Sequence, residues 1–379
     1  MYNGKYAIVI GGMHFNPLGI IRSLGEAGIR TVFINMSERG FCESSKYTIE
    51  TIRLKDGYSI ADAVLDTVKK MGGKPSVFPS CDYSAQYLDD NYDMLKEYVF
   101  CPGCEGELRR FISKEEMCRV AETAGFRVPE TQYADIDENF GEKLKSFGVP
   151  FIIKPVSNFN GSKNDIMICT KECQIAEAVD YFKYYKKVLI QRYVDGKNNL
   201  MVEYCGCKTR GKKAEVYGQL EKIREYPVDR GSTSYASIKE KITYIDTDFL
   251  DKLLDITNFS GIFDLELKVV DGVPYFIEIN FRNGAPAYAF TKGGFNIPAV
   301  WDAQQKGEKT GPIDFHRTKL ICEGLDLSHV FDKNISIFSW IKDYLTADAH
   351  MIANKKDIKP FISQYELLKP FFEAKFHKN

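Results

Sequence analysis

The sequence predicts an α/β protein that opens with a parallel β-α-β unit and continues with α+β units. Three observations carry this prediction. An apolar run at 5–10 precedes a helical apolar stripe and a second strand-like run at 31–35, and this order favours a parallel sheet. A helix-capping pattern at Ser113 then marks a fresh start. Two long strands, at 262–270 and 274–282, close the core with charged residues alternating along each.

The opening unit is predicted to run to about residue 110. Asn16 is interpreted as a helix cap and Pro17 as the first helical residue. Gly28 is expected to end this helix. A helical pattern near 59–71 and a strand-like segment at 76–79 continue the same unit.

The next unit is predicted to begin with a helix capped by Ser113, with Glu116 at the third helical position. Further strands are expected at 151–155, 166–170, 188–194 and twice within 200–226, and helices at 172–184 and 246–259. Beyond residue 305 the pattern is irregular and indicates short helices.

Composition excludes several classes of protein. The 379 residues suggest two or three packed units, and 44% hydrophobic and 27% charged residues are ordinary for a globular chain. A net charge of −1 gives no basic field for nucleic acid. No apolar run approaches the roughly 18 residues of a membrane-spanning helix, and none resembles a signal peptide. We therefore expect a cytoplasmic protein with no membrane insertion and with reduced thiols.

Four of the ten cysteines form close pairs, Cys101 with Cys104 and Cys205 with Cys207. The second spacing is poor for zinc, and the first pair lies in a Pro/Gly turn rather than at a helix start. Structural thiols are the favoured interpretation, and metal or redox use stays open.

The last two strands carry the most informative polar residues. Acidic and amide side chains alternate with apolar ones, so each strand has one polar face. A two-residue turn at Asp271-Gly272 would oppose Glu266 to Ile277 and point the two glutamates apart. We predict one extra residue in this turn, which would oppose Glu266 to Glu278.

On that register Glu266, Glu278 and Asn280 converge. Oxygen ligands without histidine or cysteine suit Mg²⁺, which leaves coordination places for phosphate oxygens. The pattern therefore suggests a magnesium–ATP site. A solvated sheet face with paired charges is the open alternative.

Two lysines and a small-residue loop lie upstream of these strands. Lys114 begins the capped helix, and Lys154 ends an apolar strand. The loop that follows contains Asn160, Gly161 and Ser162, whose small size lets backbone N–H groups approach phosphates. Taken alone, each feature also fits an ordinary surface lysine or loop.

The order of these parts resembles the ATP-grasp superfamily of ligases over about residues 5–305. The matching motifs are Lys114, Ile153-Lys154-Pro155 with its loop, the segment 189–196, Leu265-Glu266-Leu267 and the segment 276–282. Phe281 stands where the superfamily commonly has proline.

The resemblance implies a preATP-grasp (Rossmann-like) domain followed by a two-subdomain ATP-grasp fold. The expected division is 1–112 for the first domain, 113–187 and 188–305 for the two subdomains, and 306–379 for a C-terminal extension packed on them. It also implies roles for individual residues. Phosphates would be held by Lys114, Lys154 and the loop Asn160–Ser162. Adenine would face Gln191, Arg192, Tyr193 and Val194. Mg²⁺ (or Mn²⁺) would be held by Glu266, Glu278 and Asn280, and Arg282 would face the transferred phosphoryl group or the substrate carboxylate.

Within the superfamily the chain is most similar to carboxylate–amine ligases related to D-aspartate ligase. The segment 222–234 supports this. Lys222 and Arg224 share one strand face and are expected, with Arg282, to be catalytic. The polar turn that follows would bind a carboxylate and contains Arg230, Gly231, Ser232 and Thr233. The resemblance implies ATP, a small-molecule carboxylate and an amino-acid amine as substrates, a cell-envelope precursor as acceptor, and leaves a homodimer open. Another ATP-grasp ligase acting on a peptide or nucleotide precursor, and a non-catalytic ATP-binding module, are the alternatives.

Overall fold

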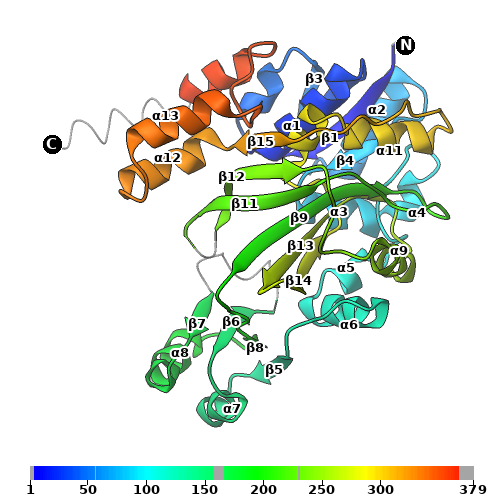
Figure 1. Ribbon diagram of the computed structural model, residues 1–379. Coiled ribbons are helices and arrows are strands. Elements are labelled where there is room, and N and C mark those ends of the chain that lie inside the picture. Colours follow the sequence, from blue (N-terminus) through cyan, green and yellow to red (C-terminus); the bar gives the residue numbers. More distant parts are fainter. Residues whose placement is uncertain (1–3, 56, 157–165, 229–230, 367–379) are drawn as a thin grey trace.

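A computed structural model describes residues 4–55, 57–156, 166–228 and 231–366. Its N-terminal part is a parallel sheet of order β3-β2-β1-β4, as the β-α-β pattern predicts (Figure 1). The elements of this part are β1 (Tyr6–Gly11), α1 (Phe15–Glu26), β2 (Arg30–Asn35), β3 (Thr48–Arg53), α2 (Ile60–Met71), β4 (Val77–Pro79) and α3 (Asp82–Asp90). Strand β3 and helix α3 carry weak periodicity and were not predicted.

Helix α1 begins one residue before the predicted cap. The side chain of His14, not that of Asn16, caps the helix, because its Nδ1 accepts a hydrogen bond from the Asn16 amide at 3.1 Å. Asn16 is instead buried inside the first turn, where its amide donates to the carbonyls of Ser80 and Asn283. The predicted cap therefore links the N-terminal domain to a distant loop. Gly28, with φ of +80°, follows the end of the helix as predicted.

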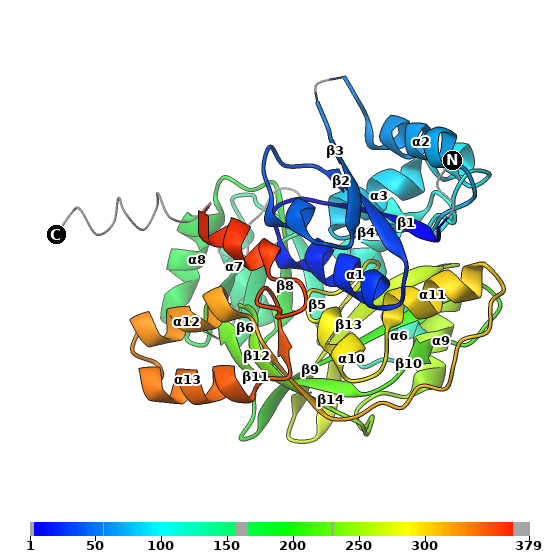
Figure 2. The same cartoon turned by 90° about the horizontal axis from the view of Figure 1, so that it is seen from above.

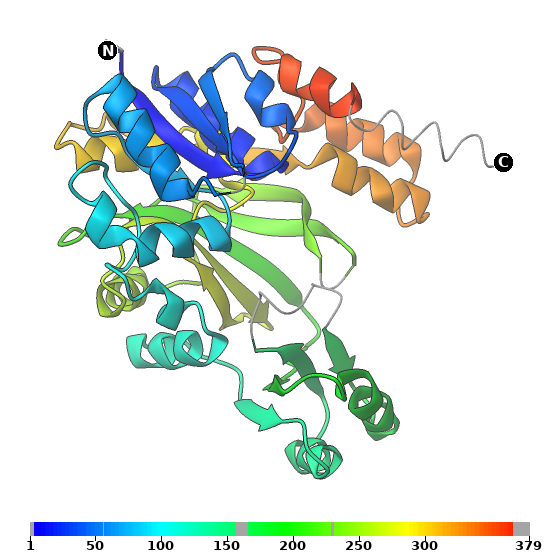
Figure 3. The same cartoon turned by 180° about the vertical axis from the view of Figure 1, so that it is seen from behind.

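The middle of the chain forms a small antiparallel sheet that projects from the rest of the molecule (Figure 3). It is preceded by α6 (Lys114–Ala124), whose first turn is capped by Ser113 as predicted. The sheet order is β5-β8-β6-β7, and its elements are β5 (Thr131–Asp135), α7 (Phe140–Phe147), β6 (Phe151–Pro155), β7 (Met167–Cys169), α8 (Ile175–Phe182) and β8 (Lys187–Arg192).

The remaining strands build one large sheet of order β14-β13-β9-β11-β12-β15-β16, with β10 paired to β9. Its elements are β9 (Asn199–Lys208), β10 (Glu215–Val216), β11 (Gln219–Tyr226), β12 (Ser232–Lys239), α9 (Thr247–Ile256), β13 (Gly261–Val270), β14 (Val273–Asn280), α10 (Ala287–Lys292), α11 (Ile297–Gln305), β15 (Thr318–Ile321), α12 (Glu323–Phe331), α13 (Ile337–Thr346) and β16 (Ala349–His350). The segment after residue 305 thus adds two strands to this sheet as well as the expected short helices, which lie side by side (Figure 2).

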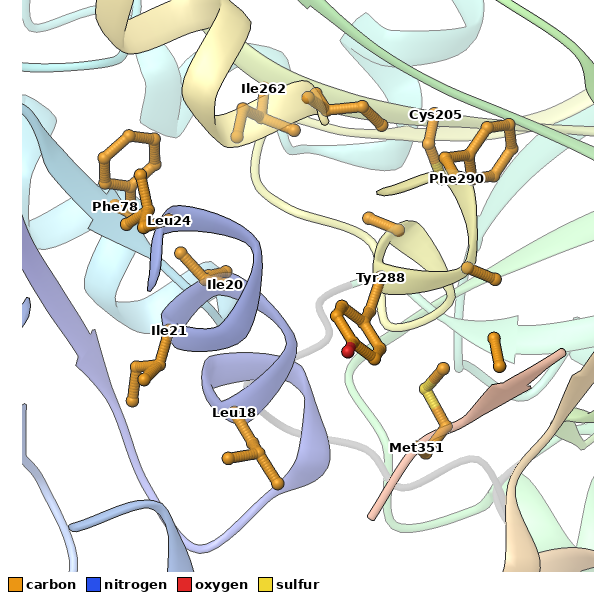
Figure 4. Close-up of a cluster of buried hydrophobic side chains, with 14 of the residues drawn as sticks. Leu18, Ile20, Ile21, Leu24, Phe78, Cys205, Ile262, Tyr288, Phe290 and Met351 are labelled. Carbon is orange, nitrogen blue, oxygen red and sulfur yellow. The ribbon is translucent and has the colours of Figure 1, made fainter. Parts of the chain in front are cut away.

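The two faces of the large sheet pack against different parts of the chain. Val202, Tyr204 and Leu265 lie in a core shared with α6 and α9. Cys205 and Ile262 face the other way and join a core with α1 and α10, and Figure 4 shows both side chains in this core together with Phe290. This second core holds the N-terminal domain against one half of the sheet face.

The paired cysteines lie in these cores. Cys101, Cys104, Cys205 and Cys207 are buried, and burial raises the pKa of the Cys101 thiol to about 12. Within the described ranges, the structure contains no cluster of three or more histidine, cysteine or acidic side chains arranged around a metal. These surroundings fit the structural interpretation of the four thiols.

No helix in the described part of the chain is long and apolar enough to cross a membrane.

The segment after residue 305 is anchored to the N-terminal domain through Arg22 of α1. Its guanidinium is fully buried, pairs with Asp357 at 3.1 Å, and donates to the carbonyls of Met351 and Ile352. The Asp357 carboxylate also accepts from Ser45 and from the Lys46 amide.

We predict that Asp357→Ala lowers the free energy of unfolding by about 3–5 kcal/mol, because it leaves the buried Arg22 charge without its counter-ion. Urea denaturation followed by circular dichroism measures this change. Glu308→Ala is the control, since Glu308 forms a surface pair with Lys5, and its loss should hardly move the midpoint. Equal midpoints for the two variants would contradict the anchoring role.

Candidate active site

The pairing of β13 with β14 places Glu266 directly opposite Glu278, as predicted. The extra residue that produces this register does not lie in the turn, however. The turn is a strict two-residue turn, with φ of +48° at Asp271 and +83° at Gly272, and Val270 pairs with Val273. The predicted three-residue loop is therefore wrong. The extra residue is Ile277, which forms a bulge within β14 and shifts the register before Glu278.

Carboxylates form a row across three neighbouring strands on this face of the sheet. Glu203 of β9 pairs with Glu266 of β13, which pairs with Glu278 of β14. Two residues along, Asp264 lies opposite Asn280. Directly opposed residues point to the same side of a sheet, so these side chains share one face. Glu203 and Asp264 were not among the predicted site residues.

Lys222 of β11 compensates part of this negative charge. Its ammonium lies 3.1 Å from Glu203 and 3.0 Å from Glu266, and all three side chains are largely buried. Burial disfavours the charged ammonium, but the two glutamates hold the pKa of Lys222 well above its usual value. Burial and the neighbouring Glu266 raise the pKa of Glu203, against the effect of Lys222. The row therefore carries more negative charge than its lysine balances.

The two predicted phosphate lysines and part of the predicted metal site line a single cleft. This open cleft of about 500 Å³ lies between α6, the small sheet and the edge strand β14. Lys114, Lys154, Glu278 and Asn280 all contribute to its wall. The other lining residues are Asp82, Ile112, Met117, Cys118, Leu189, Ile277, Ile279 and Phe281.

Both lysines are half-buried, and no carboxylate of the described residues lies within ion-pair distance of either. Lys114 donates to the Pro155 carbonyl and Lys154 to the Gln191 side chain, each at 3.2 Å. Burial, together with repulsion by Lys154, lowers the pKa of Lys114 to about 8. Burial also lowers the pKa of Lys154. A polyanion in the cleft would stabilise both charges.

Arg282, just beyond β14, joins this strand to the N-terminal domain. Its Nε donates to Asp82 of α3 at 3.0 Å, and one Nη donates to Asn280 at 3.1 Å. Asp264 lies 4.0 Å from the other Nη. Burial disfavours the charged guanidinium, but Asp82 and Asp264 raise the pKa of Arg282. The arginine thus stands beside the amide predicted to bind metal.

Strand β8 contributes Gln191, whose side-chain oxygen accepts a hydrogen bond from Lys154 and whose amide donates one to the Thr131 hydroxyl. The side chain of Arg192 is engaged elsewhere, with Glu130 and the carbonyls of Phe147 and Gly148. Tyr193 lies under Lys268, 4.4 Å from the ammonium to the ring centre. The predicted contact with adenine would be made by the backbone of Arg192, Tyr193 and Val194, and it stays a prediction.

Other predicted residues lie in different surroundings. Arg224 pairs with Asp326 at 2.8 Å and Asp343 at 2.7 Å, both from the C-terminal helices α12 and α13. These ion pairs give Arg224 an anchoring role for the C-terminal helices, and its catalytic role stays a prediction. The ion pairs are non-local, since both aspartates follow Arg224 by about one hundred residues.

Two of the four residues of the predicted carboxylate-binding turn lie in a strand. Ser232 and Thr233 begin β12, and the Thr233 hydroxyl donates to Glu203 at 2.7 Å. Gly231 is buried against Tyr226 and Pro227. Arg230 and the loop residues Asn160, Gly161 and Ser162 lie outside the described residues, so their predicted roles stay predictions.

The donor set fits a magnesium ion. Glu266 and Glu278 are adjacent carboxylates on one face, with the amide of Asn280 two residues along β14. Burial, with like charge from Glu203 and Glu266, raises the pKa of Asp264 well above its usual value. Hard oxygen donors such as carboxylates and amides are the ligands that Mg²⁺ prefers.

We predict that Lys222→Met lowers the free energy of unfolding by about 3–5 kcal/mol, because it strands two largely buried carboxylates. Thermal unfolding measures the effect. The double variant Lys222→Met with Glu203→Gln removes one of the stranded charges and should recover part of the loss. A double variant less stable than the single one would contradict this charge balance.

No protein-family model matches the chain. In sequence, the chain is 22% identical to D-aspartate ligase of Enterococcus faecium (strain Aus0004), an alignment that covers 78% of this chain and 75% of that protein. This similarity agrees with the predicted resemblance.

Solved structures share the fold at low identity. N5-carboxyaminoimidazole synthetase from Staphylococcus aureus, complexed with ADP, superposes with a TM-score of 0.68 at 15% identity, over 88% of this chain and 86% of that one. L-amino acid ligase from Bacillus licheniformis gives 0.61 at 15%, over 84% and 80%. Both belong to the ATP-grasp group of folds, so the predicted fold class is confirmed.

Proposed function

We propose that this protein is an ATP-dependent carboxylate–amine ligase that forms an amide or peptide bond through an acyl phosphate. One observation carries the proposal. Lys114 and Lys154 face Glu278 and Asn280 across a single cleft, although they come from different sheets and helices. Two lysines that have no carboxylate partner among the described residues, opposite hard oxygen donors, suit a triphosphate with its magnesium ion. The ATP-grasp fold and the similarity to D-aspartate ligase support the same conclusion.

Each group has a role in this reaction. Lys114 and Lys154 neutralise the phosphates, and Gln191 fixes the ammonium of Lys154. Glu266, Glu278 and Asn280 would hold Mg²⁺ (or Mn²⁺), which supplies charge neutralisation on the phosphate oxygens when bound. Arg282 faces the transferred phosphoryl group or the attacking carboxylate. Positioning and charge neutralisation account for the chemistry, so no nucleophilic side chain is required.

The steps follow from these positions. A substrate carboxylate oxygen attacks the γ-phosphorus and the bond to the ADP oxygen breaks, which gives an acyl phosphate and ADP. An amine then attacks the acyl carbon, loses a proton, and expels inorganic phosphate. The amine is proposed to be an amino acid such as D-aspartate, and the carboxylate a cell-envelope precursor, on the similarity to D-aspartate ligase alone. The homodimer and the cytoplasmic location stay predictions.

We predict that Glu278→Ala and Asn280→Ala each lower ADP release by about 100-fold or more, because each removes a proposed metal ligand. A coupled ADP assay over D- and L-amino acids with candidate carboxylates measures the rate, and circular dichroism checks the fold. Glu138→Ala, at an exposed site on the small subdomain, is the matched control. Folded variants with unchanged rates would exclude the metal assignment.

We also predict that nucleotide binding takes up about half a proton at pH 8, because Lys114 is then half neutral and the phosphates favour its charged form. Affinity for ADP should therefore fall as the pH rises above 8. Calorimetry in two buffers of different protonation enthalpy measures the uptake. Lys114→Met should reduce the uptake, whereas Lys145→Met, which removes a surface lysine paired with Glu142, should leave it unchanged. Equal heats in both buffers with the intact protein would contradict the prediction.

A further inference from the structure

We propose that Asp82 of the N-terminal domain is a positioning residue for Arg282, so that this domain sets the geometry of the reaction centre. The inference rests on the proposed function. Asp82 also lines the cleft that Lys114, Lys154, Glu278 and Asn280 share. Among the described residues of that wall, it is the one charged side chain that comes from the N-terminal domain.

The hydrogen bond to Asp82 fixes the Nε side of the Arg282 guanidinium. Nε donates to Asp82 at 3.0 Å, one Nη donates to the Asn283 carbonyl at 3.2 Å, and the other to Asn280 at 3.1 Å. These bonds use three of the five N–H groups of an arginine. Two terminal N–H groups have no hydrogen-bond partner among the described residues, although Asp264 lies 4.0 Å from one terminal nitrogen. These two groups are left to bind the oxygens of a phosphoryl group or carboxylate, and Asp82 determines which edge carries them.

Asp82 is held on a rigid support. It is the first residue of α3, where a carboxylate is favoured by the helix dipole. The Ser84 hydroxyl accepts from the Cys81 amide at 3.3 Å and so fixes the start of the helix. Near the other end, the buried Asp89 carboxylate accepts from the amides of Cys104, Gly106 and Leu108.

A second tether lies beside this ion pair. The side chains of Asn16 and Asn283 bond to each other at 2.6 Å, and Asn16 also donates to the Asn283 and Ser80 carbonyls. Both asparagines are buried. The N-terminal domain thus holds the backbone next to Arg282 through Asn16, and it holds the Arg282 side chain through Asp82.

The charge of Asp82 allows its role to be separated from nucleotide binding. An extra carboxylate in the cleft repels phosphates, so its removal should leave ADP affinity unchanged or raise it. Removal also frees the arginine from its working position, and small misplacements of this kind cost about 10- to 100-fold in rate. We therefore expect Asp82→Ala to lower kcat without weakening ADP binding.

The experiment measures kcat for ADP release and the Kd of ADP with magnesium for the Asp82→Ala, Asp82→Glu and Asp90→Ala variants. We expect about 10- to 100-fold lower kcat for Asp82→Ala and partial recovery with Asp82→Glu. Asp90 lies on the same helix as Asp82 and forms a surface pair with Arg109, so Asp90→Ala is the control and should not change kcat. In the Arg282→Lys background, Asp82→Ala should add no further loss. Unchanged kcat for Asp82→Ala, weakened ADP binding, or losses that multiply would overturn the proposal.

A spectroscopic readout separates this proposal from the proposed function. In ¹⁵N-labelled protein the Arg282 Nε–H signal, assigned through Arg282→Lys, should exchange slowly with solvent and should become fast in Asp82→Ala. An unchanged exchange rate overturns the positioning role. Absence of ADP release from the intact protein with every carboxylate and amine would instead refute the ligase function.

Discussion

The register between β13 and β14 is the constraint on which the site depends. Because side chains alternate along a strand, a slip of one residue would move Glu278 to the opposite face and separate it from Glu266. The bulge at Ile277 absorbs one residue within the edge strand and restores the pairing after a tight two-residue turn. Glu203, Glu266 and Glu278 then form a continuous row over three strands. A formal net charge of −1 conceals this local separation of acidic and basic groups.

Three regions of the chain supply the parts of the cleft. The small sheet and α6 contribute the lysines, the large sheet contributes Glu278 and Asn280, and the N-terminal domain holds Arg282 through Asp82. The segment after residue 305 completes the support, because its strands extend the large sheet and its Asp357 is buried against Arg22. The N-terminal domain is therefore fixed at two places, by a buried apolar core with α10 and by these polar contacts.

Local patterns were enough to predict much of the fold. The Ser113 cap, the β-α-β opening and the polar faces of the last two strands follow from sequence neighbours, and all appear in the structure. The predicted position of the extra hairpin residue was wrong, although the sequence held the signal. Asp271-Gly272 is typical of a two-residue turn, so a shared face for Glu266 and Glu278 requires the extra residue inside a strand, where Ile277 forms the bulge. Glu203, Asp82 and the ion pairs of Arg224 depend on contacts between distant segments, for which one sequence holds no local signal.

The most direct test of the account is the position of the metal and phosphates in crystals grown with Mn²⁺ and a non-hydrolysable ATP analogue. Anomalous diffraction locates the manganese without ambiguity. The account predicts a manganese ion bound to Glu278 and Asn280 next to Glu266, with the triphosphate between that ion and the ammonium groups of Lys114 and Lys154. Manganese at another face of the sheet, or an analogue bound away from the two lysines, would contradict it.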